Sequence, residues 1–225
     1  MKIEAVLFDM DGLMVDTESL STKALISSAK KQDYEMTKEE TLQVLGFTEA
    51  AIYKFWENYF EDSHVDGKKL ADDYYDYIEE VLFTTGPDKM PNVEELLVYL
   101  KENNYKIAVA SSSNIDHIEN NMKKTRLRKY IDKIASGQEV LNGKPAPDVF
   151  LLAAERLGVK PENCLVLEDS KSGIKAGHAS GATVFMVPDM FKPDEECIEI
   201  ANRILKNLGE VINILEEEND KDFNR

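Results

Sequence analysis

Short apolar runs recur along this chain, and amphipathic stretches of helical length separate them. Runs of this kind are typical of strands buried on both faces, because a half-buried strand would alternate apolar and polar residues. Strands that alternate with helices indicate a parallel sheet covered by helices on both sides. We therefore expect an α/β fold, a doubly wound (Rossmann-like) parallel sheet with strands at residues 5–8, 106–110, 133–135, 164–167 and 183–187.

Several of the expected helices carry recognisable ends. Asn92 is a candidate N-cap with Glu95 three residues later, and Thr37 with Glu40 has the spacing of a capping box. Gly158 is a natural C-cap. Outside the insertion described next, helices are expected at residues 92–103, 147–157 and 208–218.

Residues 17–84 interrupt the alternation, because they contain no convincing strand. The segment starts just after the first strand and ends near the Gly86-Pro87 pair, which is a strong chain-turning signal. We predict a helical-bundle cap domain at 17–84, inserted into a catalytic core made of 1–16 and 85–225. The cap is expected to contain four helices, at residues 18–32, 38–45, 49–60 and 67–83.

The chain is strongly acidic, with 27 Lys and Arg against 43 Asp and Glu and a net charge of −16. This balance argues against nucleic acid or an anionic membrane as the main partner. No apolar run reaches the about 18 residues of a membrane span, and the N-terminus does not resemble a signal peptide. Cys164 and Cys197 make no disulfide framework. We expect a cytoplasmic monomer with no nucleic-acid or membrane partner.

Polar side chains follow three of the apolar runs, at the points where the strands would end. In a doubly wound sheet the carboxyl ends of the strands meet at one edge, where ligands bind. A loop before the helix at 147–157 adds the one cation of these motifs. The candidate site residues are Asp9, Asp11, Ser111, Lys144, Glu168 and Asp169.

These residue types suit phosphoryl transfer. Asp9 and Asp11 are two residues apart and share a face while the chain stays extended. One carboxylate could attack phosphorus to form an aspartyl-phosphate, and the other could protonate the leaving oxygen and then activate water. Several carboxylates cannot gather without compensating charge, and Mg²⁺ suits both oxygen ligands and a phosphate partner. Ser111 could donate to a phosphate oxygen, and Lys144 could stabilise the charge of the transferring group.

The same residues resemble the motifs of the haloacid dehalogenase (HAD) superfamily, in its β-phosphoglucomutase-like phosphatase branch. The motifs occur in order, so the resemblance covers nearly the whole chain, including the place of the cap. It is greatest to phosphatases of sugar phosphates and nucleoside monophosphates, such as the pseudouridine 5′-phosphatases and 2-deoxyglucose-6-phosphatases. The four motifs lie at residues 9–18, 107–111, 143–148 and 164–177.

The resemblance implies a role for each candidate residue. Asp9 would be the nucleophile and Asp11 the general acid/base. Ser111 and Lys144 would bind the transferring phosphoryl group, with Lys144 also acting in catalysis. The implied activity is Mg²⁺-dependent hydrolysis of a small phosphomonoester, a sugar phosphate or a nucleoside monophosphate, through an aspartyl-phosphate. The implied Mg²⁺ ligands are Asp9, Asp11 through its backbone carbonyl, Asp169 and Glu168.

A sugar phosphomutase of the β-phosphoglucomutase type is the alternative. Such mutases hold a second phosphate with an Arg that follows a cap glycine, whereas here the stretch is Gly46-Phe47-Thr48-Glu49 and Glu49 has the wrong charge. The segment 17–84 contains no Arg, and its 7 Lys stand against 15 Asp and Glu. Arg is the preferred bidentate partner of phosphate. These features favour hydrolysis of a monophosphate whose leaving group carries no further anion.

A non-catalytic phosphate-binding module is a remote alternative, which the presence of all the candidate aspartates disfavours. Eleven of the 19 aromatic residues fall within 17–84, where we expect them to form the core of a small helix bundle. Ser112 and Ser113 are interpreted as polar loop residues. We expect no catalytic role for the histidines, which lie outside the motifs, at His64, His117 and His178.

Overall fold

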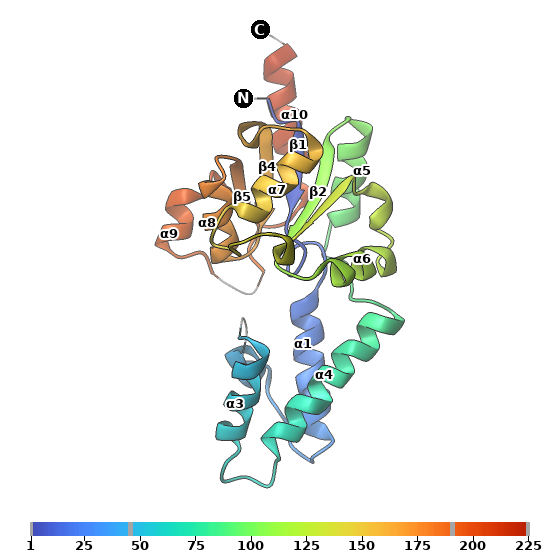
Figure 1. The fold of residues 1–225 in the computed structure, drawn as a ribbon, viewed down its shortest axis with the longest axis vertical. Coiled ribbons are helices and arrows are strands. Elements are labelled where there is room, and N and C mark those ends of the chain that lie inside the picture. Colours follow the sequence, from blue (N-terminus) through green and yellow to red (C-terminus); the bar gives the residue numbers. More distant parts are fainter. Residues whose placement is uncertain (1, 45–46, 190–191, 224–225) are drawn as a thin grey trace. The chain divides into compact units, whose positions relative to one another are not determined.

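A computed structural model describes residues 2–44, 47–189 and 192–223 of the protein. The chain forms two compact units (Figure 1). The first, which we call the core unit, comprises Met1–Val15 and Lys89–Arg225. The second, the helical unit, comprises Asp16–Asp88. No helix among the described residues is long and apolar enough to cross a bilayer.

The core unit is built on a parallel six-stranded sheet, which confirms the α/β doubly wound fold expected from the sequence. The strand order is β3-β2-β1-β4-β5-β6, so the order reverses beside β1. In such sheets the crevice at that reversal is where ligands bind. The strands are β1 (Ala5–Phe8), β2 (Lys106–Ser111), β3 (Lys133–Ser136), β4 (Cys164–Glu168), β5 (Thr183–Met186) and β6 (Arg203–Ile204).

The five predicted strands are all present, and the sixth was not predicted. β6 has two exposed residues and no apolar run, so its sequence carries no strand pattern. Its pairing with β5 defines it, at Phe185 with Arg203 and Met186 with Ile204. Three strands also extend one residue beyond the predicted runs, to Ser111, Ser136 and Glu168.

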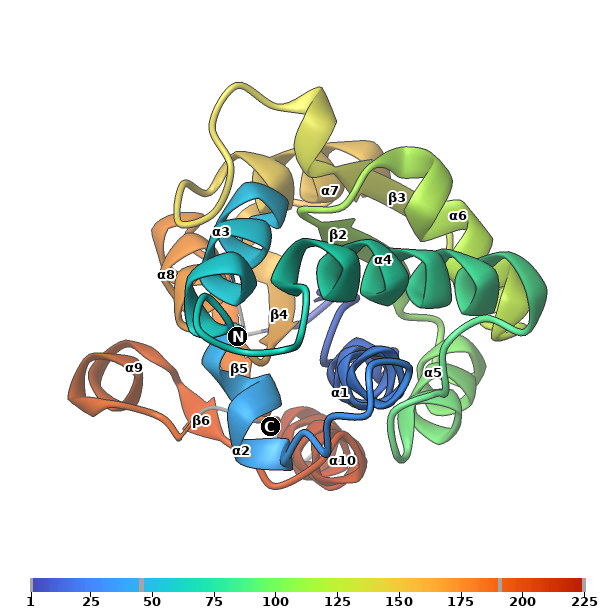
Figure 2. The ribbon, with the colours of Figure 1, turned by 90° about the horizontal axis from the view of Figure 1, so that it is seen from below.

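Alternate residues of each strand face opposite layers of helices. On β1, Val6 and Phe8 pack in one cluster while Ala5 and Leu7 pack in another. Figure 2 shows α7 and α8 on one side of the sheet and α5 and α10 on the other. The first cluster includes α5 (Val93–Glu102), α6 (Ile115–Lys124) and α10 (Gly209–Phe223), and the second includes α7 (Asp148–Leu157), α8 (Lys171–Ala179) and α9 (Glu195–Ile200).

The predicted helix ends of the core unit are partly right. Gly158 ends α7 in the left-handed conformation, at φ +63°, as expected. Asn92 precedes α5 but is itself left-handed, and its side chain caps no backbone N–H. Its amide instead donates to Glu95 Oε2 at 2.9 Å, so Asn92 occupies the expected N-cap position without making the capping hydrogen bond. Short 3₁₀ helices lie at η2 (Arg128–Tyr130), η3 (Gly137–Glu139) and η4 (Pro161–Asn163).

The helical unit contains the four predicted helices, the second of them shortened. Thr37 and Glu40 form the expected capping box at the start of that helix, which continues as a 3₁₀ turn. Gly46, in the stretch compared with the mutases, lies outside the described residues. Helix α4 packs against both α1 and α3 (Figure 2). The helices are α1 (Thr17–Lys30), α2 (Lys38–Thr41), η1 (Leu42–Val44), α3 (Glu49–Tyr59) and α4 (Gly67–Thr84).

Most aromatic residues of the helical unit belong to its core, as predicted. Trp56 is fully buried and packs against the rings of Phe55, Tyr59 and Phe60. The exceptions lie on the surface, where Phe83 is 82% exposed. Packing of these rings supplies apolar burial that four short helices need to hold together.

The carboxylate of Glu40, in the capping box of α2, links this helix to Tyr34 in the preceding loop and to Tyr59 of α3. The hydroxyls of Tyr34 and Tyr59 donate to Glu40 Oε1 at 2.5 and 2.7 Å. The N–H and hydroxyl of Thr37 donate to Oε2, both at 2.7 Å. Led by the bond from Tyr34, these donors lower the pKa of Glu40 to about 2, because they stabilise its ionised form.

We predict that Glu40→Gln destabilises the helical unit at neutral pH and has a smaller effect near about pH 3. Because the pKa is lowered on folding, the contribution is fully present above the ordinary value of 4.5 and is lost as the pH falls toward about 2. Urea unfolding followed by the fluorescence of Trp56, the single tryptophan, measures this. Glu39→Gln is the matched control, and equal destabilisation by Glu40→Gln at both pH values would contradict the prediction.

Candidate active site

Asp9 lies directly after β1 and is paired with a buried lysine. Its backbone N–H donates to the Leu167 carbonyl at 3.0 Å, which ties it to β4. Lys144 Nζ donates to Asp9 Oδ1, to Glu168 Oε1 at 2.7 Å and to the Ala110 carbonyl at 3.2 Å. The Lys144 side chain is only 5% exposed. The lysine therefore connects the carboxyl ends of β1, β2 and β4.

Glu168 is fully buried and has both carboxylate oxygens engaged. Oε1 accepts from Lys144, and Oε2 accepts from the N–H and hydroxyl of Ser170 at 2.8 and 2.9 Å. Helix α8 passes so close that a Cβ on Gly173 would lie 1.6 Å from Oε1. The sequence suggested Glu168 as a possible metal ligand. In the structure its carboxylate contacts Lys144 and Ser170, and the role as a metal ligand stays a prediction.

Asp169 and the turn after β1 lie against one another. Gly12 adopts a φ of +74°, and a Cβ at this position would lie 2.5 Å from Asp169 Oδ2. A side chain at residue 12 would therefore be excluded by both backbone conformation and space. The turn is closed by Met14 and Val15, whose N–H groups donate to the Met10 carbonyl at 2.8 and 3.1 Å.

Asp11 faces the end of β2. Ser113 Oγ donates to Asp11 Oδ2 at 2.9 Å, and Ser111 Oγ approaches the same oxygen at 3.5 Å. Ser111 is almost fully buried, while Asp11 is half-buried. From the sequence, Ser113 was interpreted as a polar loop residue, with contact to substrate as the alternative. The one sequence signal for a contact with Asp11 was the position of Ser113 two residues after Ser111. That signal was insufficient, because the direction of a loop side chain depends on tertiary packing.

The structure thus brings the six predicted residues to the carboxyl edge of one sheet, around the reversal of strand order. Contacts link Lys144 with Asp9 and Glu168, and Asp11 with Ser111. The histidines take no part in these contacts. His64 Nε2, in the helical unit, lies 3.1 Å from the Gln32 carbonyl instead.

Negative charge exceeds positive charge among these residues. Burial, followed by repulsion from Glu168, raises the pKa of Asp169, and burial is also the largest cause that raises the pKa of Asp9. Burial alone would lower the pKa of Lys144, but Asp9 and Glu168 raise it above its ordinary value. One ammonium group cannot balance four carboxylates, so the cluster suits an added cation.

The donor set fits Mg²⁺ in type. Mg²⁺ is usually held by one or two carboxylates, with waters and substrate phosphate oxygens completing the octahedron. Asp9 and Asp169 supply two carboxylates, and the Asp11 backbone supplies a carbonyl. Within residues 2–44, 47–189 and 192–223, no three His, Cys, Asp or Glu side chains form a metal-binding group. The Mg²⁺ ligand set of Asp9, Asp169 and Asp11 contains only two such side chains, because its third ligand is a backbone carbonyl.

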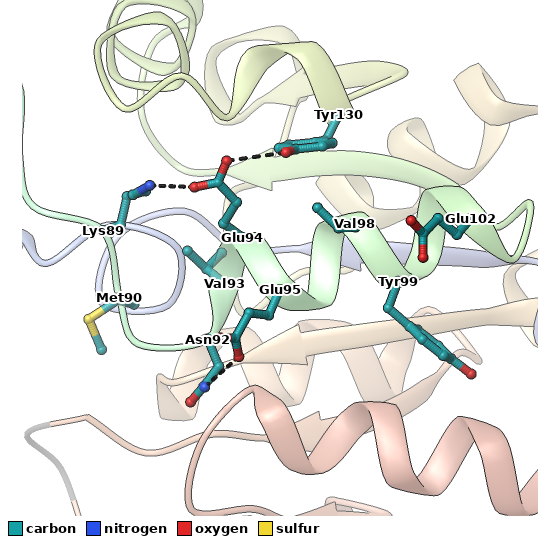
Figure 3. A pocket seen from close by; sticks show the side chains of 10 residues that line it. All are labelled: Lys89, Met90, Asn92, Val93, Glu94, Glu95, Val98, Tyr99, Glu102 and Tyr130. Atoms are coloured by element: carbon teal, nitrogen blue, oxygen red, sulfur yellow. Dashed lines mark hydrogen bonds and ion pairs between the residues drawn. The ribbon is translucent and has the colours of Figure 1, made fainter.

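The core unit also has a pocket away from these residues. It has a volume of about 680 Å³ and lies along α5 (Figure 3). Glu94, in its wall, accepts from Lys89 at 2.5 Å and from the Tyr130 hydroxyl at 3.1 Å. None of the six predicted site residues lines it. The chemistry-bearing residues therefore lie outside this pocket.

Comparison with known proteins reveals similarity over most of the chain. Residues 6–187 match the family model described as haloacid dehalogenase-like hydrolase. A Drosophila melanogaster protein named probable pseudouridine-5′-phosphatase is 34% identical and aligns over 93% of this chain and 91% of that protein. A Thermotoga maritima protein named phosphorylated carbohydrates phosphatase is 30% identical, over 96% and 99%.

A solved structure is also similar. It is a HAD family hydrolase from Deinococcus radiodurans with bound phosphate and sodium, with a TM-score of 0.82 and 26% identity over 96% of each chain. The family match and the names of the two relatives support a phosphatase activity.

We predict that Gly173→Ala lowers kcat by about 100-fold, because its methyl group would displace the Glu168 carboxylate and with it Lys144. Gly177→Ala is the matched control on the same helix, since its Cβ would meet only valine side chains, at 3.0 Å. Steady-state kinetics with circular dichroism measures both variants. Equal kcat losses in the two variants would show that any added methyl group on α8 lowers kcat, and that displacement of Glu168 is not the cause.

Proposed function

Given that the chain belongs to the haloacid dehalogenase-like hydrolase family, we propose that it is a Mg²⁺-dependent phosphomonoester hydrolase that acts through an aspartyl-phosphate on Asp9. The observation that carries this proposal is the contact of Asp9 with buried Lys144 at the edge where Asp11 and Asp169 also lie. The arrangement provides a carboxylate nucleophile, a second carboxyl group and a fixed cation in one place.

In the first step, an oxygen of the Asp9 carboxylate attacks phosphorus and the bond from phosphorus to the leaving oxygen breaks. Asp11, in its protonated form, gives its proton to the leaving oxygen, so the alcohol departs neutral. Lys144 and the Ser111 hydroxyl bind the oxygens of the transferring group. Lys144 donates to Asp9 in the structure, so the cation lies beside the nucleophile before substrate binds.

In the second step, water attacks the phosphorus of the aspartyl-phosphate. Asp11, now a carboxylate, takes a proton from this water, and the bond from phosphorus to the Asp9 oxygen breaks. The products are inorganic phosphate, the Asp9 carboxylate and protonated Asp11. The enzyme therefore returns to its starting state without any other reactant.

Asp9, Asp169 and the Asp11 carbonyl would hold Mg²⁺, which when bound supplies positive charge to the phosphoryl oxygens. We assign Glu168 a different role from the one suggested by the sequence. Since its two oxygens contact Lys144 and Ser170, it positions the lysine rather than holding the metal.

We propose sugar phosphates or nucleoside monophosphates as the substrate class, which the names of the two relatives support. The helical unit would act as the cap domain that selects among them. Its segment 17–84 has no Arg and a large excess of acidic residues, so it is poorly suited to a second phosphate. This favours hydrolysis of a monophosphate over the phosphomutase alternative.

Phosphate release from a panel of sugar phosphates, nucleoside monophosphates and small phospho-acids tests the function. We expect release with Mg²⁺ that falls to background with excess EDTA and returns on adding Mg²⁺, because the carboxylate cluster lacks compensating charge without it. Release that persists in EDTA would contradict metal dependence. Interconversion of sugar monophosphates after priming with a bisphosphate would establish the mutase instead.

We predict that Asp9→Asn lowers kcat by about 10⁴-fold or more while the fold is retained, because an amide is a poor nucleophile. Labelled phosphate from substrate should appear on the wild-type protein after acid quench and be absent from the variant. Asp116→Asn, an exposed aspartate on α6, is the control for both measurements. Normal turnover by Asp9→Asn would rule out the covalent route.

A further inference from the structure

We propose that Ser113, itself held by Ser136, positions the Asp11 carboxyl group for proton transfer. Neither serine belongs to the residues assigned above. The inference rests on the proposed role of Asp11 as general acid/base, and it concerns only contacts made within the core unit.

The contact between Ser113 and Asp11 leaves one carboxyl oxygen available. Ser113 Oγ donates to Asp11 Oδ2 at 2.9 Å, well within hydrogen-bonding range, whereas Ser111 at 3.5 Å is at its limit. The described residues make no hydrogen bond to Asp11 Oδ1. If Ser113 keeps donating to Oδ2 in the protonated acid, Oδ1 is the oxygen that carries the proton.

Ser113 is in turn fixed at both backbone groups. Its N–H donates to Ser111 Oγ at 3.1 Å, and its carbonyl accepts from Ser136 Oγ at 2.7 Å. Ser136 is the last residue of β3 and is fully buried. The loop after β2 is therefore held by the end of the neighbouring strand.

The end of β3 has a support of its own. The Ser136 N–H donates to Glu139 Oε2 at 3.0 Å, as part of a capping box. Arg156 of α7 donates to the two oxygens of Glu139 at 2.8 and 2.9 Å. The next residue, Gly137, packs so closely on the β2 loop that a Cβ there would lie 2.9 Å from the Ser112 backbone.

Such support matters because proton transfer depends on geometry. A general acid acts when it lies within about 2.6–3.2 Å of the atom it protonates. The half-buried Asp11 side chain could otherwise occupy several rotamers, of which only some would reach the leaving oxygen. A displacement of about 1 Å can cost 10²-fold in rate. Ser113 thus acts through Asp11 and is a positioning residue.

The experiment compares two leaving groups. Protonation of the leaving oxygen matters greatly for a sugar or nucleoside alcohol and little for p-nitrophenol, which departs readily as an anion. We expect Ser113→Ala to lower kcat/KM about tenfold for the alkyl phosphate turned over fastest and about twofold or less for p-nitrophenyl phosphate. This parameter reports the transfer to Asp9, the step in which the leaving group departs.

Two variants serve as controls. Ser113→Thr keeps the hydroxyl and should restore the alkyl phosphate activity. Ser112→Ala removes the neighbouring exposed hydroxyl, for which no side-chain hydrogen bond is seen among the described residues, and should leave both substrates unaffected. Equal losses of Ser113→Ala on the two substrates would overturn the inference, because a merely structural defect does not distinguish leaving groups.

Ser136 is tested by a double-mutant cycle. Ser136→Ala should reproduce the difference between the two substrates, to a smaller extent than Ser113→Ala. The double variant should show no larger a difference than Ser113→Ala alone, since Ser136 acts on Asp11 through Ser113. Additive effects would overturn this part of the inference.

Asp11→Asn separates the inference from the proposed function. It should show the same selective loss on the alkyl phosphate, with a larger magnitude. If Asp11→Asn shows it and Ser113→Ala does not, the function stands and the positioning role fails. If Asp11→Asn shows no selective loss, Asp11 is not the general acid and the positioning role of Ser113 falls with it, while hydrolysis through Asp9 stands on its own tests.

Discussion

A buried ammonium group determines how the carboxyl edge of this sheet is built. Lys144 lies almost entirely out of water, and burying a charge costs several kcal/mol unless it is paired and hydrogen-bonded. Asp9 and Glu168 provide that pairing from two adjacent strands, and the Ala110 carbonyl provides a further acceptor from a third. Asp9 therefore lies where the lysine needs a counter-charge. The same contact positions the nucleophile and neutralises the lysine.

The close approach at α8 follows from that pairing. Glu168 can reach Lys144 only if the first turn of α8 leaves room for its carboxylate, and Gly173 provides the room. A second glycine, Gly12, allows the turn after β1 to lie against Asp169. Two glycines without any chemistry of their own thus determine how near the carboxylates can come. That nearness creates the excess negative charge which makes a divalent cation suitable.

Much of this arrangement is predictable from sequence, for a topological reason. Once five apolar runs are read as parallel strands, Asp9, Ser111 and Glu168 must share an edge, whatever the details of the loops. The partners of each side chain are a different matter. The two oxygens of Glu168 and the hydroxyl of Ser113 could each point several ways, and only the packing of α8 and of the β3 end selects one. Asn92 shows the same limit, since its left-handed backbone depends on tertiary context. β6 exists only through its pairing with β5.

The central place of β1 bears on how the chain is made. Its two neighbours in the sheet are β2 and β4, and the second of these ends at Glu168. During synthesis β1 is made before β2 and β4, so it cannot gain both partners until translation has reached Glu168. The helical unit is one continuous segment, Asp16–Asp88, with its own apolar core, and can pack well before then. The strand that leads into the nucleophile is thus the first strand of the sheet to be made and among the last to be enclosed.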